Sequence, residues 1–282
     1  MKNSDLPSIA ELLRQAHQRL KTVSDSPLLD AQLLLAHSLQ KEISYLLAWQ
    51  EVVPDLPQQT LFQGYLVQRE QGIPVAYLLG CKEFWSLPFA VTPDVLIPRP
   101  ETELLVEQVL EYCQTLEQAR ILELGTGSGA IAIALAKEIP NASITASDIS
   151  SAALDIARKN AQTLNQQRIE FVLSDWFTAI PLNTFDIIVS NPPYIEAADE
   201  HLTGAIRHEP MTALVSGADG LDAIRVIISE AKAYLQNGGA LMLEHGYKQG
   251  KQIRKLFAAS GYKQARTIRD YAGNERVTTG IL

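Results

Sequence analysis

The chain has 282 residues, of which 46% are hydrophobic and 20% charged, so it carries enough apolar material for a sizeable core. Its formal net charge of −8 and its pI of about 5.2 argue against a general binder of nucleic-acid backbones, because such proteins need clustered Lys and Arg. The two cysteines, Cys81 and Cys113, are too few for a disulfide framework or a zinc site. With no apolar signal segment at the N-terminus, the sequence predicts a cytoplasmic protein.

Residues 1–80 are predicted to form a small helical domain. Apolar residues recur there at helical spacing, first at Ile9, Leu12, Leu13, Ala16 and Leu20. Ser26 is predicted to cap a second helix that begins at Pro27, and a further helix is expected to end at Gly72. No strand pattern interrupts this region, so we expect a bundle of helices.

Beyond residue 80 the pattern changes. Residues 81–98 combine aromatic and alternating apolar residues with prolines, which predicts a hairpin connector. From residue 119 onward seven predicted strands alternate with helices across short turns, and residues 99–282 are therefore expected to form one α/β domain. Such a sheet is mostly parallel and doubly wound, with ligands at the carboxyl ends of its strands. The closely spaced last two strands, "ARTIRD" and "ERVTTGIL", indicate an antiparallel pair.

A glycine loop follows the first strand of this domain. Gly125, Gly127 and Gly129 stand at every second position, unlike the spacing that seats a pyrophosphate on a helix N-terminus. Glu123, two residues before the first of these glycines, would repel a phosphate but suit a cationic ligand. The loop therefore matches S-adenosyl-L-methionine, which carries a sulfonium and an ammonium group, better than a nicotinamide dinucleotide.

The next two strands also end in acidic residues. Asp148 lies 19 positions beyond Gly129, where an acid is placed to accept hydrogen bonds from ribose hydroxyls. Asp175 could accept from an exocyclic adenine amine, and Trp176 could cover the purine ring. A core position is an equal alternative for Trp176, since buried tryptophans are common.

The fourth strand ends in the tetrapeptide Asn191-Pro192-Pro193-Tyr194. In a doubly wound sheet this strand adjoins the first, so its end lies beside the glycine loop. An amide or aryl-amine nitrogen is a poor nucleophile because its lone pair is delocalised. Two acceptors, Asn191 Oδ1 and the Pro192 carbonyl, could orient such a nitrogen and stabilise the positive charge that develops on it. Tyr194 could pack against the flat substrate group.

Together these motifs identify a family resemblance. The chain resembles the release-factor glutamine methyltransferases (the PrmC/HemK family) over nearly its whole length. The resemblance is carried by "LIPRPETE" at 96–103, "ELGTGSGAIAIALA" at 123–136, "SDWF" at 174–177, "SNPPYI" at 190–195 and "RDYAGNERV" at 269–277. It implies an N-terminal substrate-recognition domain, a hairpin connector and a class I (Rossmann-like) methyltransferase domain.

The resemblance also implies the reaction. Family members transfer a methyl group from S-adenosyl-L-methionine to the side-chain amide nitrogen of the Gly-Gly-Gln glutamine in class 1 peptide chain release factors, and release S-adenosyl-L-homocysteine. The family's cofactor contacts correspond to Gly125, Thr126, Gly127, Ser128, Gly129, Asp148, Trp176 and Asn191. Its substrate clamp corresponds to Asn191, Pro192, Pro193 and Tyr194. Arg99 and Glu101 are expected to line or close the site.

Two other functions are compatible with some of these features. The same tetrapeptide occurs in N6-adenine methyltransferases of nucleic acid, although the acidic chain and the absence of an inserted recognition domain argue against that activity. A non-catalytic binder with a vestigial nucleoside site is the other alternative, and the intact tetrapeptide beside an intact loop argues against it. The five scattered histidines have no metal-ligand spacing, and nothing demands more than a monomer.

Overall fold

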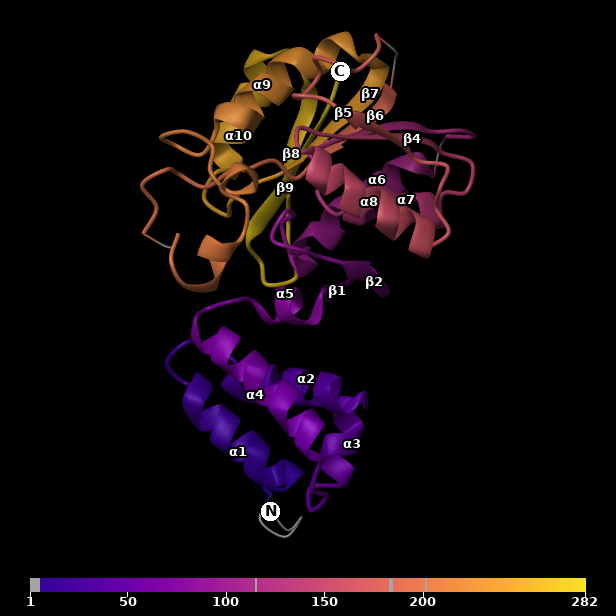
Figure 1. Cartoon of the computed structure of the whole chain (residues 1–282). Coiled ribbons are helices and arrows are strands. Elements are labelled where there is room, and N and C mark those ends of the chain that lie inside the picture. Colours follow the sequence, from indigo (N-terminus) through magenta and orange to yellow (C-terminus); the bar gives the residue numbers. More distant parts are fainter. Residues whose placement is uncertain (1–5, 115, 183–184, 201) are drawn as a thin grey trace. The chain divides into compact units, whose positions relative to one another are not determined.

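The computed structural model describes residues 6–114, 116–182, 185–200 and 202–282, which separate into two compact units (Figure 1). Of the described residues, one unit combines those within 6–80 with the short segment 202–208, and the other combines those within 81–200 and 209–282. In the part of the chain that the structure describes, no helix is both long and apolar enough to cross a membrane.

The first unit is helical, as the sequence predicts. Its helices are α1 (Ile9–Leu20), α2 (Pro27–Leu39), α3 (Ile43–Ala48), α4 (Leu56–Glu70) and α5 (Val75–Leu79). The predicted apolar face of α1 is buried, and it packs with Leu34, Phe62 and Leu66. The predicted N-cap position and start of α2, at Ser26 and Pro27, are confirmed, although the Ser26 side chain makes no capping hydrogen bond in the described chain.

The segment after the tetrapeptide contributes to this helical unit. Its 3₁₀ turn, η3 (Gly204–His208), groups with the helices, and Arg207 donates to the carbonyl of Gln71 over 3.2 Å. Nothing in the local sequence around residue 204 indicated this grouping, because it depends on a contact between residues far apart in the chain.

The second unit opens with an antiparallel hairpin of β1 (Cys81–Phe84) and β2 (Leu87–Ala90). Asn160 fixes the end of this hairpin. Its Oδ1 accepts from the N–H of Ala90 at 2.8 Å, and its Nδ2 donates to the carbonyls of Ala90 and Ser128 at 3.0 and 2.9 Å. One buried amide thus joins the hairpin to the glycine loop.

A seven-stranded sheet with the order β5-β4-β3-β6-β7-β9-β8 forms the centre of the second unit. Its strands are β3 (Arg120–Leu124), β4 (Ser143–Asp148), β5 (Glu170–Leu173), β6 (Phe185–Ser190), β7 (Leu235–Glu244), β8 (Lys263–Arg269) and β9 (Glu275–Ile281). The first five in this order are parallel, while β9 runs antiparallel to both neighbours. The predicted doubly wound sheet, with β3 beside β6 and an antiparallel last pair, is confirmed.

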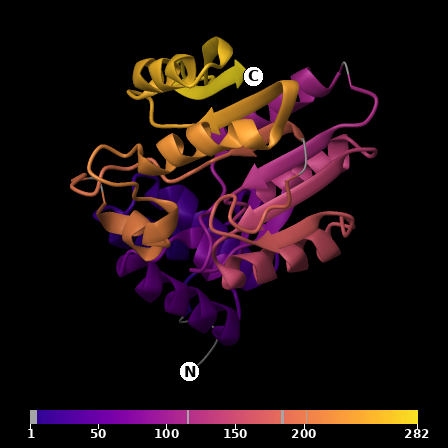
Figure 2. The same cartoon turned by 90° about the horizontal axis from the view of Figure 1, so that it is seen from above.

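Helices cover both faces of this sheet (Figures 1 and 2). The 3₁₀ turn η2 (Pro100–Thr102) leads into α6 (Glu103–Cys113), which packs on one face with α7 (Ala130–Glu138) and α8 (Ser151–Thr163). On the other face lie α9 (Asp222–Glu230) and α10 (Gly250–Ala259). Alternate residues of β3 and β6 enter the two cores, because successive strand side chains point to opposite faces. The carboxyl ends of the parallel strands stay clear for a site.

Candidate active site

Two neighbouring cavities lie at the carboxyl ends of β3, β4, β5 and β6. The larger measures about 480 Å³, a size typical of nucleoside-type ligands, and the smaller about 50 Å³. Both are bordered by Gly125, Gly127 and Asn191. The larger also meets Asp148, Asp175, Trp176 and Pro193, and the smaller meets Glu123, Thr126 and Ser128. Of the residues predicted for the site, Gly129, Pro192 and Tyr194 border neither cavity in the described chain.

The glycine loop has a backbone that only glycine adopts easily. Gly125 and Gly127 have φ values of +71° and +55°, and a Cβ added at either would meet no described atom within 4 Å. Their missing side chains therefore leave open space where the cavities meet. Gly129 has another role, since an added Cβ would lie 3.2 Å from Ala157 Cβ and 3.0 Å from Ile133 Cδ1. It permits close packing of α7 on α8.

Glu123 is buried beneath this loop, with only 1% of its surface exposed. Its Oε2 accepts hydrogen bonds from Thr126 Oγ1 at 2.7 Å and from the N–H of Ala132 at 3.0 Å. Burial disfavours the charged form and raises the pKa of Glu123 to about 8. At neutral pH without a ligand, this side chain is therefore mainly protonated.

Asp148 shapes the loop as well as facing the larger cavity. Its Oδ2 accepts from the N–H of Gly127 at 2.8 Å, and its Oδ1 accepts from the N–H of Ser150 at 2.9 Å. Burial raises the pKa of Asp148, while these backbone donors act in the opposite direction. Each carboxylate oxygen has a second lone pair, so the side chain keeps acceptor capacity toward the cavity.

Trp176 lies at both of the places that the sequence left open, the cavity and the core. The half-buried indole borders the larger cavity and also packs against the apolar core on the α9 side of the sheet. Its φ of +46° is unusual for a residue other than glycine. Ser174 holds the turn, since its Oγ donates to the carbonyl of Trp176 at 2.9 Å and accepts from the N–H of Ala179 at 3.0 Å.

The tetrapeptide at the end of β6 is held by side chains from several elements. Asn191 Nδ2 donates to Thr102 Oγ1 at 3.2 Å, which leaves Asn191 Oδ1 as an acceptor. The Tyr194 hydroxyl donates to Glu244 Oε1 at 3.3 Å, and burial raises the pKa of this phenol. Just before the tetrapeptide, Ser190 Oγ donates to the carbonyl of Leu124 at 2.7 Å, which ties β6 to the entrance of the glycine loop.

Several of these supporting residues were missed by the sequence analysis. Glu244 lies at the end of β7 with 1% of its surface exposed, and burial raises its pKa to about 7. Glu209 accepts from the N–H of Ile97 at 3.0 Å and pairs with Arg99 at 2.5 Å. The predicted Arg99 borders the smaller cavity, whereas Glu101 is exposed and borders neither among the residues described.

Comparison with known proteins agrees with this architecture. The fold and the position of the cleft are those of a class I methyltransferase, and residues 100–218 match the family model named Methyltransferase small domain. A solved methyltransferase from Pyrococcus furiosus shares the fold, with a TM-score of 0.52, 19% identity, and coverage of 78% of this chain and 96% of that one. Residues 11–80 match the model named PrmC N-terminal domain.

Full-length relatives identify the family. The release factor glutamine methyltransferase of Coxiella burnetii is 48% identical, with 96% of this chain and 97% of that protein covered. The protein of the same name from Escherichia coli K12 is 45% identical, with 95% and 96% covered. The chain belongs to the release factor glutamine methyltransferases.

Proposed function

We propose that this protein transfers a methyl group from S-adenosyl-L-methionine to the side-chain amide nitrogen of the glutamine in the Gly-Gly-Gln motif of class 1 peptide chain release factors. The products are N5-methylglutamine and S-adenosyl-L-homocysteine. The names of its relatives support the substrate class. The observation that carries the proposal is the amide of Asn191, which borders both cavities and whose Nδ2 donates to Thr102 Oγ1.

The chemistry of the two cavities fits the proposed cofactor. The larger cavity offers Asp148 for the ribose hydroxyls, Asp175 for the adenine amine and Trp176 for the purine face. The open space over Gly125 and Gly127 and the nearby acid of Glu123 suit the charged methionine end. When bound, S-adenosyl-L-methionine supplies an electrophilic methyl group on a sulfonium centre.

The contribution of the protein to the reaction is orientation. Asn191 Oδ1 and the Pro192 carbonyl are proposed to accept the two N–H groups of the substrate amide, which aims its nitrogen and stabilises the positive charge that develops there. Pro192 suits this role because its ring fixes φ. Holding two reactants in line is worth effective molarities on the order of 10⁵–10⁸ M in favourable cases. This transfer needs no general base before attack, since the product can lose its proton to water.

All residues that border the two cavities belong to the second unit. The helical unit, which contains residues 1–80, is therefore proposed to serve substrate recognition rather than cofactor binding. The hairpin connector at 81–98 and the methyltransferase domain at 99–282 complete the proposed organisation, and the protein is proposed to act as a monomer in the cytoplasm.

The function is tested by labelling. The purified protein is incubated with methyl-labelled S-adenosyl-L-methionine and a class 1 release factor, with two controls: the same factor with its Gly-Gly-Gln glutamine changed to alanine, and duplex DNA. We expect label on the intact factor alone, which mass spectrometry locates on that glutamine. Label on DNA would instead show an adenine methyltransferase, and equal label on the alanine factor would contradict the proposed acceptor.

The Asp148→Ala variant should bind the cofactor more weakly by about 1–3 kcal/mol, because it loses a charged acceptor for the ribose. The same change frees the N–H of Gly127, which adds to the loss. Calorimetric titration with S-adenosyl-L-methionine measures the effect. Asp155→Ala is a matched control, since Asp155 is a largely exposed acid on α8 and borders neither cavity in the described chain. Unchanged affinity in Asp148→Ala would contradict the ribose assignment.

A further inference from the structure

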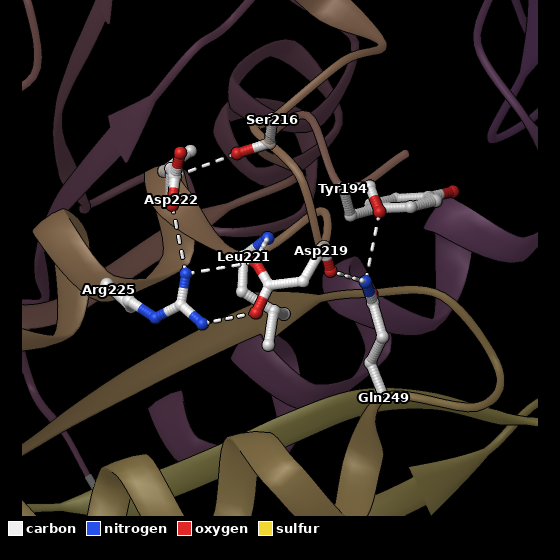
Figure 3. Close-up of polar contacts among 8 residues, drawn as sticks. Tyr194, Ser216, Asp219, Leu221, Asp222, Arg225 and Gln249 are labelled. Carbon is white, nitrogen blue, oxygen red and sulfur yellow. Dashed lines mark hydrogen bonds and ion pairs between the residues drawn. The ribbon is translucent and has the colours of Figure 1, made fainter. Parts of the chain in front are cut away.

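Gln249 lies beside Tyr194, the last residue of the tetrapeptide, and its side chain points toward Tyr194 and Asp219 (Figure 3). Its Oε1 accepts from the N–H of Gly246 at 2.8 Å. Its Nε2 donates to the carbonyl of Tyr194 at 3.0 Å and to the carbonyl of Asp219 at 3.5 Å. Gln249 borders neither cavity as far as the structure describes the chain, and these hydrogen bonds of its side chain go to backbone groups of the protein itself.

Gln249 also binds the segment of residues 216–222, and an ion pair with Arg225 stabilises this segment (Figure 3). Arg225, on α9, donates from both terminal nitrogens to the Asp219 carboxylate and pairs with Asp222 at 2.9 Å. The Asp219 carboxylate also accepts from the N–H of Leu221 at 3.2 Å. A fork of this kind between a guanidinium and a carboxylate has a defined geometry, so it favours one orientation of the Asp219 side chain.

This segment approaches the tetrapeptide more closely than a side chain would allow. A Cβ added at Gly220 would lie 2.3 Å from the carbonyl oxygen of Tyr194 and 2.8 Å from Gln249 Nε2, and Gly220 has a φ of +72°. At Gly217 an added Cβ would lie 1.9 Å from Asp222 Oδ2. Gly220 therefore requires glycine for space as well as for backbone conformation, whereas Gly217 requires it for its φ of +72°, because the Asp222 carboxylate can move aside.

The tetrapeptide depends on such support because of its own composition. Pro192 and Pro193 have no backbone N–H, so they cannot anchor the chain by donating to a neighbouring strand. The carbonyl of Tyr194 offers an anchor on the far side of the prolines, and Gln249 binds it. Immediately afterwards Ile195 joins Val215 in a parallel bridge, so the chain beyond the anchor is also held.

We propose that Gln249 is a positioning residue for methyl transfer, which holds the Tyr194 peptide so that the Asn191 and Pro192 acceptors keep their places. The inference rests on the proposed function and adds a residue that borders neither of the two cavities among the described residues. The donor Nε2 is the atom that matters for this role, because it joins the tetrapeptide to the Asp219 carbonyl. The acceptor Oε1 instead binds the N–H of Gly246, in the turn between β7 and α10.

Two substitutions of Gln249 distinguish the effect of its Nε2 donor from that of its Oε1 acceptor. Gln249→Glu keeps an acceptor for Gly246 but places an oxygen against the carbonyls of Tyr194 and Asp219. Gln249→Lys removes the acceptor for Gly246 and keeps a flexible donor for the two carbonyls. We expect kcat on the release factor to fall about 10- to 100-fold in Gln249→Glu, since small displacements of a clamp have effects of this order. Gln249→Lys should lose less than Gln249→Glu.

The readouts are kcat and KM for the release factor, the Kd of the cofactor by calorimetry, and the thermal unfolding midpoint. Gln252→Glu provides the same charge change at an exposed position on α10 and should behave as wild type. Turnover of Gln249→Glu within about twofold of wild type would overturn the proposal. So would a larger loss in Gln249→Lys, which would show that the acceptor to Gly246 matters instead. Absence of label with the wild-type protein would contradict the proposed function, and this inference with it.

Discussion

The Asn191→Ala variant should fold, retain much of its affinity for the cofactor and lose about 10²–10³ in kcat, as expected when one preorganised transition-state hydrogen bond is removed. The amide of Asn191 is oriented before the substrate binds, because its Nδ2 donates a hydrogen bond to Thr102 Oγ1 at 3.2 Å. Alanine removes the acceptor for the nucleophile but leaves the glycine loop and the strand ends in place. The loss is therefore expected in the chemical step rather than in cofactor binding.

Single-turnover methylation of the release factor and calorimetry with the cofactor measure the two effects separately. Thr102→Val is an informative companion, since it removes the partner of Nδ2 and lets the Asn191 amide rotate while the acceptor is still present. We expect a loss of about tenfold for it, in line with the loss of a neutral hydrogen bond. Near-normal turnover in Asn191→Ala would contradict the proposed role of this residue.

The sequence predicted the parts of the site that depend on strand order. Alternating strands and helices place Gly125, Asp148, Trp176 and Asn191 at successive strand ends, and those ends meet at one edge of a parallel sheet. Each of these positions can be located from a local pattern, because a run of apolar residues stops and a polar or glycine residue follows. The doubly wound topology then brings them together.

The supporting residues could not be predicted in this way. Thr102 lies 89 positions from Asn191, Glu244 lies 50 from Tyr194 and Gln249 lies 55 from Tyr194. No periodicity or local motif marks a contact over such distances, so these residues emerge only when the chain is folded. Trp176 shows another limit, because its sequence position could not decide between core and cavity, and the structure places the indole against both.

Cofactor affinity should rise as the pH rises toward about 8, by at most about tenfold per pH unit for one linked proton. The pKa of Glu123 is about 8 in the folded protein because the carboxyl is buried. A bound cation favours the carboxylate, so binding at neutral pH should release a proton from this group. Calorimetry at several pH values, in buffers that differ in ionisation enthalpy, measures both the affinity and the number of protons released.

Glu123→Gln is the deciding control, because the amide has the same shape and cannot ionise. In this variant the pH dependence should flatten and the released proton should disappear; identical pH dependence in the two proteins would contradict the assignment of Glu123. S-adenosyl-L-homocysteine shows which charge is responsible. It has the ammonium group but no sulfonium, so an unchanged slope would assign the effect to the ammonium.

The same group predicts how folding stability of the ligand-free protein varies with pH. The folded pKa of about 8 lies above the value of 4.5 for an unperturbed glutamate, so the folded state binds more protons than the unfolded state between these values. The contribution of Glu123 to stability is therefore fully present below pH 4.5, is lost as the pH rises toward 8, and is constant above that. Its full amplitude is on the order of a few kcal/mol.

Because Glu244, with a pKa of about 7, acts in the same direction, the effect of Glu123 is taken from the difference between wild type and Glu123→Gln in denaturant unfolding at each pH. From pH 5 to pH 8 the free energy of unfolding of the wild type should decrease relative to that of Glu123→Gln. A difference between the two proteins that does not change with pH would show that Glu123 is already ionised in the ligand-free protein.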